Sequence, residues 1–269
     1  MNFSLAVMLQ MSLLLPIIGM LAIVATGNKP NLREAVTIST CLMLLYCVIN
    51  LYQGLNTGEQ ISVIWWELLP GLQVSFAIEP LGMLFALIAS FLWLITSIYS
   101  IGYMRKHKEK NQTRFYACFA IAISAVMGVA FAANLFTLFI FYEALTLSTY
   151  PLVTHSGVEK AKNGGRIYLG ILLSTSIIFF LLAIVSTWFV AGTLDFKPGG
   201  VFSTNVDTVL VGAILVLFIF GIGKAAIMPF HRWLPAAMVA PTPVSALLHA
   251  VAVVKAGVFT VLKVCVFIF

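Results

Sequence analysis

Residues 208–234, TVLVGAILVLFIFGIGKAAIMPFHRWL, contain a long apolar run that is interrupted by Lys224 and then by Pro229. An apolar run of this length is typical of a helix that crosses a bilayer. A charge inside such a helix costs at least about 2.5 kcal/mol, so it needs a partner, a water-filled cavity or neutralisation. The stretch therefore predicts a membrane-spanning helix that carries an ionisable site.

The rest of the chain has the same apolar character. Of its 269 residues, 61% are hydrophobic and 9% are charged, whereas about a quarter of the residues in soluble proteins are charged. So few polar groups could not cover the surface of a soluble domain, which excludes that class. The composition predicts an all-α, multi-spanning bundle of transmembrane helices in a lipid bilayer.

Eight apolar runs predict eight spanning helices, at residues 4–26, 34–54, 81–103, 115–133, 135–155, 167–192, 208–228 and 242–265. The longest connection, 55–80, carries Trp65 and Trp66 with three acids and no lysine or arginine. This pattern predicts an external loop with an aromatic anchor at the membrane interface.

The basic residues indicate the orientation of the bundle. If the N-terminus lies outside, the outer loops hold only Lys197 and Lys263, whereas the inner loops hold eleven basic residues: Lys29, Arg33, Arg105, Lys106, Lys108, Lys110, Arg114, Lys160, Lys162, Arg166 and Arg232. The positive-inside rule therefore predicts an outside N-terminus. Lys263 is expected to snorkel to the outer surface, with no role in transport. His107 and His155, in or beside basic loops, are expected at the surface.

The net charge of +6 would suggest nucleic acid in a soluble protein, but these loop charges determine topology, so no nucleic-acid partner is expected.

A break is predicted just after Lys224. Pro229 cannot donate a hydrogen bond to the carbonyl of Ala225, and its ring crowds that carbonyl. Gly221 and Gly223 loosen the same turn. The freed carbonyls form the negative end of a half-helix, which would stabilise an ammonium and admit water. In the alternative, Lys224 snorkels to the inner interface, because it lies about 24 Å along the helix from its start.

A second charge is predicted near the middle of the membrane. Glu143 lies in NLFTLFIFYEALTLSTYP, between Asn134 and Pro151. A lone carboxyl at that depth favours its protonated form, while a nearby ammonium favours the ionised form, so such a group is easily switched. The alternative is a packing carboxyl held in a permanent salt bridge.

The last predicted helix carries two more ionisable residues. Thr242 suits an N-cap and Pro243 the first helical position. His249 and Lys255 then lie about 9 Å apart along the axis and could border a hydrated path without touching. Ser245 lies one turn before His249 and could be its hydrogen-bond partner. His249 could instead be a packing residue.

Beyond the break, His231 is a candidate for the entrance to this path, together with Ser245. The sequence has no phosphate-binding glycine loop, no HExxH motif and no nucleophile elbow. Its cysteines lack the spacing of a metal site. Neither a cofactor nor a metal is therefore expected.

Two stretches resemble a known family. They are PFHRWLPAAMVAPTPVSALLHAVAVVKAG, from Pro229, and FYEALTLSTYPLV, around Glu143. Both are similar to motifs of the antiporter-like proton-translocating subunits shared by respiratory NADH–quinone oxidoreductase and the Mrp multisubunit Na⁺/H⁺ antiporters. HAVAVVKAG looks closest to the D-type Mrp subunits. The resemblance implies that Lys224 is the central proton carrier, that Glu143 forms and releases an ion pair with it, and that His249 and Lys255 form a relay.

The resemblance also implies a division of the chain. Residues 1–110 would hold three leading helices, and residues 111–269 the first five-helix repeat of the family, its fourth to eighth helices, with a broken seventh helix. The second, inverted repeat is absent from the sequence, so a truncated form is expected.

The leading hypothesis is a proton-translocating subunit of an Mrp-type Na⁺/H⁺ antiporter, a transporter subunit rather than an enzyme. It would lie in the plasma or bacterial inner membrane with other membrane subunits, and would exchange H⁺ for Na⁺ or K⁺. One alternative is the pump subunit of an NADH–quinone oxidoreductase or a membrane-bound hydrogenase. Another is a scaffold or inactive fragment that transports nothing.

Overall fold

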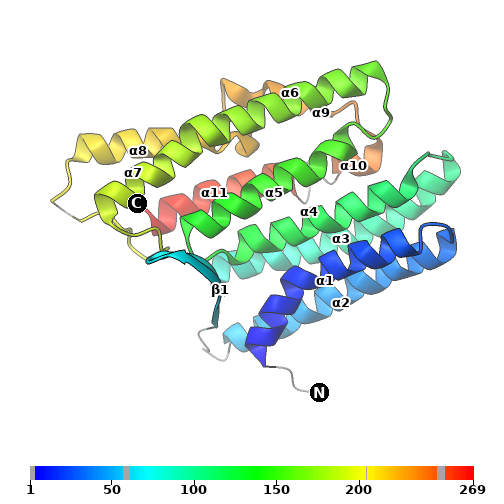
Figure 1. Ribbon diagram of the computed structural model, residues 1–269, viewed down its shortest axis with the longest axis horizontal. Coiled ribbons are helices and arrows are strands. Elements are labelled where there is room, and N and C mark those ends of the chain that lie inside the picture. Colours follow the sequence, from blue (N-terminus) through cyan, green and yellow to red (C-terminus); the bar gives the residue numbers. More distant parts are fainter. Residues whose placement is uncertain (1–3, 57–60, 204, 247–251) are drawn as a thin grey trace.

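The computed structural model describes residues 4–56, 61–203, 205–246 and 252–269, and these form a bundle of long helices that lie side by side (Figure 1). The first five helices are α1 (Leu5–Ala25), α2 (Pro30–Asn56), α3 (Pro80–Lys106), α4 (Gln112–Phe131) and α5 (Leu135–Val153). They lie within a few residues of the predicted spans. The fold class predicted from the sequence, an all-α membrane bundle, is confirmed.

The sixth helix is longer than predicted. It runs without a break from Glu159 to Ala191 as α6 (Glu159–Thr175), a π-helical turn η1 (Ser176–Phe180) and α7 (Leu181–Ala191). Together with α1 to α5 it gives, in the described part of the chain, six helices long and apolar enough to cross a membrane. The chain is therefore a multi-pass membrane protein.

The seventh predicted helix is interrupted, and the eighth is described in two parts, on either side of residues 247–251. The elements are α8 (Thr208–Gly221), two short 3-10 turns at Gly223–Ala225 and Phe230–Arg232, α9 (Trp233–Ala237), α10 (Thr242–Ala246) and α11 (Val253–Phe267). A bilayer-spanning helix needs about 20 residues, so α8, with 14 residues, is too short to span alone.

Helix α4 forms the centre of the bundle. In its most apolar window 83% of the residues are buried, against 33–44% in the other five spans. It contacts α1, α3 and α5. Gly128 of α4 lies against the ring of Phe141 in α5, where any added Cβ would collide with the ring. Small residues allow membrane helices this close approach.

The connection predicted as an external loop is a β-hairpin. Strands β1 (Ser62–Leu69) and β2 (Leu72–Ala77) pair antiparallel, and Gly71 in the turn has a φ of +83°. The hairpin is fixed to the start of α5, because the Asn134 side-chain amide donates hydrogen bonds to the carbonyl of Gln73 and the hydroxyl of Ser75, both 2.9 Å long. We call this end of the bundle the hairpin end. The opposite end, with the α3–α4 and α5–α6 turns, is the basic end.

Candidate functional site

The site begins where α8 stops. Helix α8 ends at Gly221, three residues before the predicted break, and Lys224 lies in the 3-10 turn that follows. Ala226 then takes a left-handed conformation with a φ of 55°, which turns the chain away from the axis of α8. The backbone around Lys224 is thus irregular inside the bundle, an arrangement that membrane proteins tolerate only within protein or beside a water-filled cavity.

Close packing against neighbouring helices determines where α8 ends. A Cβ on Gly221 would collide with the backbone of Phe180 in the π-helical turn, and a Cβ on Gly257 of α11 would collide with the backbone of Ala225. The Lys224 turn is therefore held between two other helices, α6–α7 and α11. These contacts depend on residues far away in the sequence, which is why the predicted position of the break was wrong by three residues.

Lys224 is completely buried, with 0% of its residue surface exposed. Its ammonium Nζ donates a hydrogen bond of 2.7 Å to the carbonyl of Tyr142 in α5 and lies 3.1 Å from the centroid of the Tyr142 ring. The Lys224 backbone N–H donates to the Tyr142 hydroxyl over 3.1 Å. The alternative in which Lys224 snorkels to the membrane surface is therefore wrong.

Glu143 is the next residue of α5, and both of its carboxylate oxygens are buried. Neither oxygen has a hydrogen-bond partner among the described residues. In the same part of the chain, no nitrogen–oxygen distance of 4.0 Å or less joins Lys224 to Glu143. Among the residues that the structure describes, Glu143 is thus not held in a salt bridge.

The eighth predicted helix supplies less to this site than expected. It begins at Thr242, so Thr242 is its first residue rather than its cap, and the Pro241 carbonyl accepts hydrogen bonds from the N–H groups of Val244 and Ser245. Thr242 and Pro243 thus lie one position later in the helix than predicted. His249 lies outside the described residues.

Lys255 faces away from Lys224. Gly257 of α11 contacts the Lys224 turn, and a residue two positions away on a helix points about 200° around the axis. Accordingly, Lys255 is exposed in an apolar groove between α3 and α11, beside Leu84 and Ile88. The structure thus places Lys255 on the outer surface of the described bundle and not next to the buried lysine.

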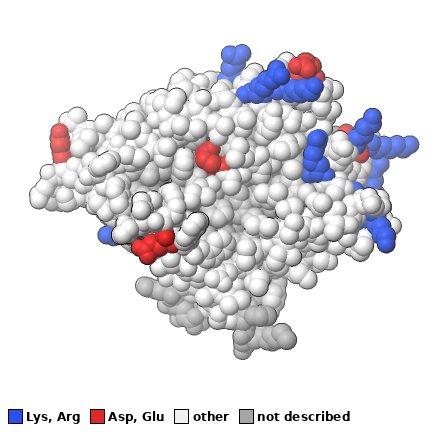
Figure 2. All heavy atoms as spheres, in the orientation of Figure 1, with Lys and Arg blue, Asp and Glu red and all other residues white. Residues whose placement is uncertain are grey.

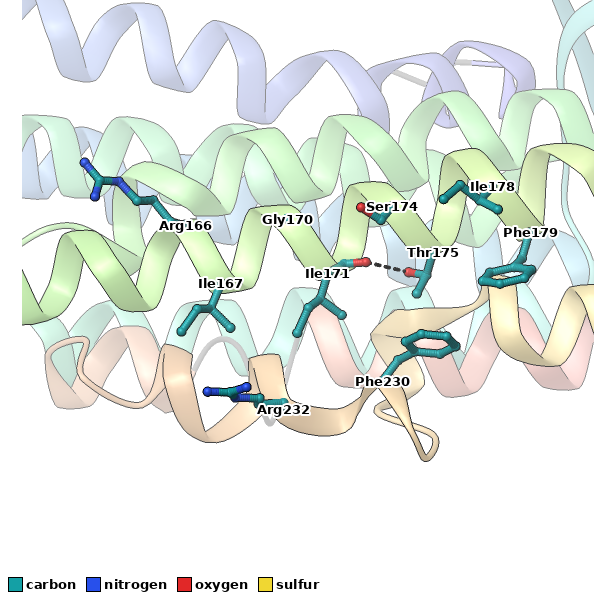
Figure 3. A pocket seen from close by; sticks show the side chains of 10 residues that line it. All are labelled: Arg166, Ile167, Gly170, Ile171, Ser174, Thr175, Ile178, Phe179, Phe230 and Arg232. Atoms are coloured by element: carbon teal, nitrogen blue, oxygen red, sulfur yellow. Dashed lines mark hydrogen bonds between the residues drawn. The ribbon is translucent and has the colours of Figure 1, made fainter.

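A groove lies beside the break, between α6 and the segment around Phe230 (Figure 3). It has a volume of about 660 Å³, with Arg166 and Arg232 at one end and Phe179 and Phe230 at the other. Thr175 forms part of its wall and packs directly against Gly223, so it separates the groove from the Lys224 turn. The groove therefore approaches the buried lysine without reaching it.

The two predicted entrance residues lie elsewhere. His231, between Phe230 and Arg232, is exposed but does not line this groove. Ser245 is half-buried in α10 and donates a hydrogen bond of 3.4 Å to the carbonyl of Ala240.

Sequence reasoning missed a second buried lysine. Lys263 of α11, expected at the outer surface, is 0% exposed, so this expectation was wrong. Its ammonium donates a hydrogen bond of 2.6 Å to the carbonyl of Ala132 and lies 3.1 Å from a carboxylate oxygen of Glu79. Glu79 directly precedes α3, and Ala132 forms the corner between α4 and α5. Lys263 thus joins three segments at the hairpin end.

The fold and the site together define a multi-pass helical membrane protein that holds ionisable side chains at a helix break inside its bundle. Residues 132–269 match the family model described as NADH:quinone oxidoreductase/Mrp antiporter, TM, and residues 69–116 match that of NADH-ubiquinone oxidoreductase (complex I), chain 5 N-terminus. The chain belongs to this antiporter-like family of proton-translocating membrane subunits.

Relatives come from both branches of the family. NAD(P)H-quinone oxidoreductase chain 5 of Synechocystis sp. is 29% identical over 91% of this chain and 38% of its own length. The A-type subunit of the Na⁺/H⁺ antiporter of Alkalihalophilus pseudofirmus is 32% identical over 82% of this chain and 28% of its own length. The chain thus spans well under half of either relative.

Solved structures share the fold. A chain of the Mrp complex from Dietzia sp. has a TM-score of 0.79 and 23% identity, with 96% of this chain and 28% of that chain covered. A chain of the membrane-bound sulfane sulfur reductase, an archaeal respiratory complex, has a TM-score of 0.79 and 21% identity, with 94% and 52% covered.

Proposed function

We propose that this chain is a proton-translocating subunit of a multisubunit monovalent cation/proton antiporter, in which Lys224 takes up and releases the proton. One observation carries the proposal: Lys224 is completely buried at a helix break and is held by a backbone carbonyl instead of a carboxylate. An ammonium buried with no carboxylate of the described residues within 4.0 Å is costly, so its charge is easily lost or moved.

The geometry around Tyr142 offers a way to move that charge. The carbonyl of Tyr142 holds the ammonium, and the next residue, Glu143, carries an unpartnered carboxyl. Rotation of the flexible lysine side chain would exchange the carbonyl for the Glu143 carboxylate and form an ion pair. The pair would stabilise the charged form of both groups, and its release would favour the loss of the proton from Lys224. Alternation between the two contacts would switch the protonation of the lysine.

The further path is proposed to run through His249 and Lys255. Lys255 lies on a groove that is otherwise apolar, and a lysine in contact with lipid alone is costly. We therefore expect polar groups or water to meet it in the assembled protein. His231 and Ser245 remain proposed entrance residues.

The finer assignments are also proposals. The sequence HAVAVVKAG favours a D-type Mrp subunit, although the Alkalihalophilus relative is of the A type. Residues 1–110 are proposed as the three leading helices and residues 111–269 as one five-helix repeat. Other membrane subunits are the proposed partners, as in the complexes that share the fold. The location is proposed to be the plasma or bacterial inner membrane, with the N-terminus outside, and Na⁺ or K⁺ is the proposed exchanged cation.

The test is ion-driven proton movement in membrane vesicles that contain the assembled complex. Lys224→Ala and Glu143→Ala should each abolish the pH change that follows an inward Na⁺ or K⁺ gradient. Lys197→Ala, an exposed lysine at the hairpin end, is the control and should behave like the unchanged protein. Full activity in both site variants would exclude the proposed role.

The match to chain 5 relatives supports a second candidate, the pump subunit of a redox-driven complex. In the same vesicles, proton movement would then follow the addition of a reductant and a quinone, and a cation gradient alone would have no effect. An assembled complex that moves protons under neither condition would support a scaffold role.

A further inference from the structure

A polar cavity of about 720 Å³ opens at the basic end of the bundle. It lies between the turn that joins α3 to α4 and the turn that joins α5 to α6. The residues that line it include Lys108, Glu109, Lys110, Arg114, His155 and Lys162. Figure 2 shows lysine and arginine side chains gathered at this end. The proposed translocation path uses none of these residues.

The cavity has a strong excess of positive charge. Four lining side chains carry a permanent positive charge, namely Lys108, Lys110, Arg114 and Lys162, against the single carboxylate of Glu109. Within the described residues, the one ion pair that these cations form is that of Lys162 with Glu159, at 3.7 Å on an exposed face. Cations gathered around a hollow repel one another, and a bound anion relieves this repulsion.

A buried histidine gives a second, independent indication. His155, expected at the surface, is only 4% exposed, so that expectation was wrong. Both of its ring nitrogens are buried without a hydrogen-bond partner in the part of the chain that the structure describes. Its backbone carbonyl accepts a hydrogen bond of 3.0 Å from the Arg114 guanidinium, which fixes Arg114 at the cavity. Buried polar atoms normally have partners, so an anion or a water bound in the cavity would supply one to this ring.

We propose that this cavity binds a phosphate group, with Arg114 and Lys162 as its main contacts and the Lys108–Lys110 turn as its cover. Guanidinium and ammonium groups are the usual ligands of phosphate oxygens. The cavity lies just beyond the ends of α3 and α5, at the level where the headgroups of anionic lipids meet a membrane protein. The phosphate belongs either to such a headgroup or to a free anion, and both present the same oxygens.

Two experimental arms distinguish these sources, with the whole chain in nanodiscs. In the lipid arm, native mass spectrometry measures the affinity for phosphatidylglycerol added to phosphatidylcholine discs. In the phosphate arm, inorganic phosphate is titrated into pure phosphatidylcholine discs while the NMR signal of the His155 ring is followed. Burial and the charge of Arg114 lower the pKa of His155, so a bound phosphate should raise that pKa again.

Lys162→Gln and Lys110→Gln should each weaken the binding about fivefold, as expected for one basic contact at a membrane surface. Both residues are in or beside turns, so these changes leave the helix packing intact. Lys29→Gln, an exposed lysine of the α1–α2 turn at the same end, is the matched control and should bind like the unchanged protein. A response in the lipid arm supports a headgroup site, and a response in the phosphate arm supports a site for a free anion. No response in either arm, or an equal loss in Lys29→Gln, overturns the proposal.

Discussion

Two lysines, Lys224 and Lys263, are both completely buried, yet their surroundings differ in one respect. Each ammonium donates to a backbone carbonyl, over 2.7 Å for Lys224 and 2.6 Å for Lys263. Each also lies near an aromatic ring, at 3.1 Å from the centroid of Tyr142 and 4.4 Å from that of Phe196. Among the described residues, only Lys263 has a carboxylate oxygen within 4.0 Å, that of Glu79 at 3.1 Å.

The difference separates a structural charge from a switchable one. A buried ion pair favours the charged form of both groups, and removal of either partner is costly. An ammonium without a counter-ion keeps its charge only as long as its neighbours favour it. Lys263 therefore locks the hairpin end of the bundle, and the surroundings of Lys224 allow its charge to change.

The largest expected effect comes from the replacement of Lys224 by an apolar residue of similar length. Lys224→Met should abolish ion-driven proton movement in vesicles, because the proposed carrier is removed. The variant should nevertheless unfold at the same or a higher temperature, because a buried unpaired charge is replaced by an apolar side chain. Thermal unfolding in nanodiscs measures the second effect. A large loss of stability would show that Lys224 is a structural charge like Lys263.

The Lys263 site should respond in the opposite way. Glu79→Gln leaves the buried ammonium unpaired and should lower the free energy of unfolding by about 3 kcal/mol. The value lies at the low end of the usual range because the Glu79 side chain is 18% exposed. Proton movement should persist at temperatures where the variant remains folded. The double variant Glu79→Leu with Lys263→Met should regain much of the stability, and a double variant as unstable as Glu79→Gln would contradict the ion-pair lock.

Replacement of Glu143 by glutamine tests whether the carboxylates of Glu143 and Glu79 have different roles. Glu143→Gln should reduce proton movement at least about tenfold, because a neutral amide cannot form the proposed ion pair with Lys224. It should not lower the unfolding temperature, since neither carboxylate oxygen of Glu143 has a described partner to lose. A destabilisation as large as that of Glu79→Gln would mean that Glu143 is paired in the folded protein.

The sequence predicted the helical bundle well, because the bilayer imposes one simple requirement on every span. Apolar runs marked the six long helices to within a few residues, apart from the start of α6, where the polar segment 159–166 continues the helix beyond the apolar run. Lys224 and Glu143 could also be identified, because a charged residue inside an apolar run is visible in the sequence whatever its side chain contacts in the fold.

Other features depend on contacts between distant segments and could not be read from the chain. The burial of Lys263 depends on Glu79 and Ala132, which no local pattern connects with it. The end of α8 depends on the approach of Gly221 to Phe180. The β-hairpin, by contrast, did have a local signal in the sequence, since Pro70 and Gly71 separate two β-rich segments. The segment was predicted as a loop because its tryptophans are typical of a membrane interface.

The smallest effect is expected for Tyr142→Phe, which makes the surroundings of Lys224 more like those of Lys263. Tyr142→Phe removes the hydroxyl that accepts the Lys224 backbone N–H, but keeps the ring and the backbone carbonyl that hold the ammonium, as Phe196 and Ala132 do for Lys263. The loss of one hydrogen bond should lower the free energy of unfolding by about 1 kcal/mol. Proton movement in vesicles should fall only a few-fold, because the carbonyl and Glu143 remain in place. A loss as complete as that of Lys224→Met would instead place the Tyr142 hydroxyl in the proton path, and the switch would then need three groups.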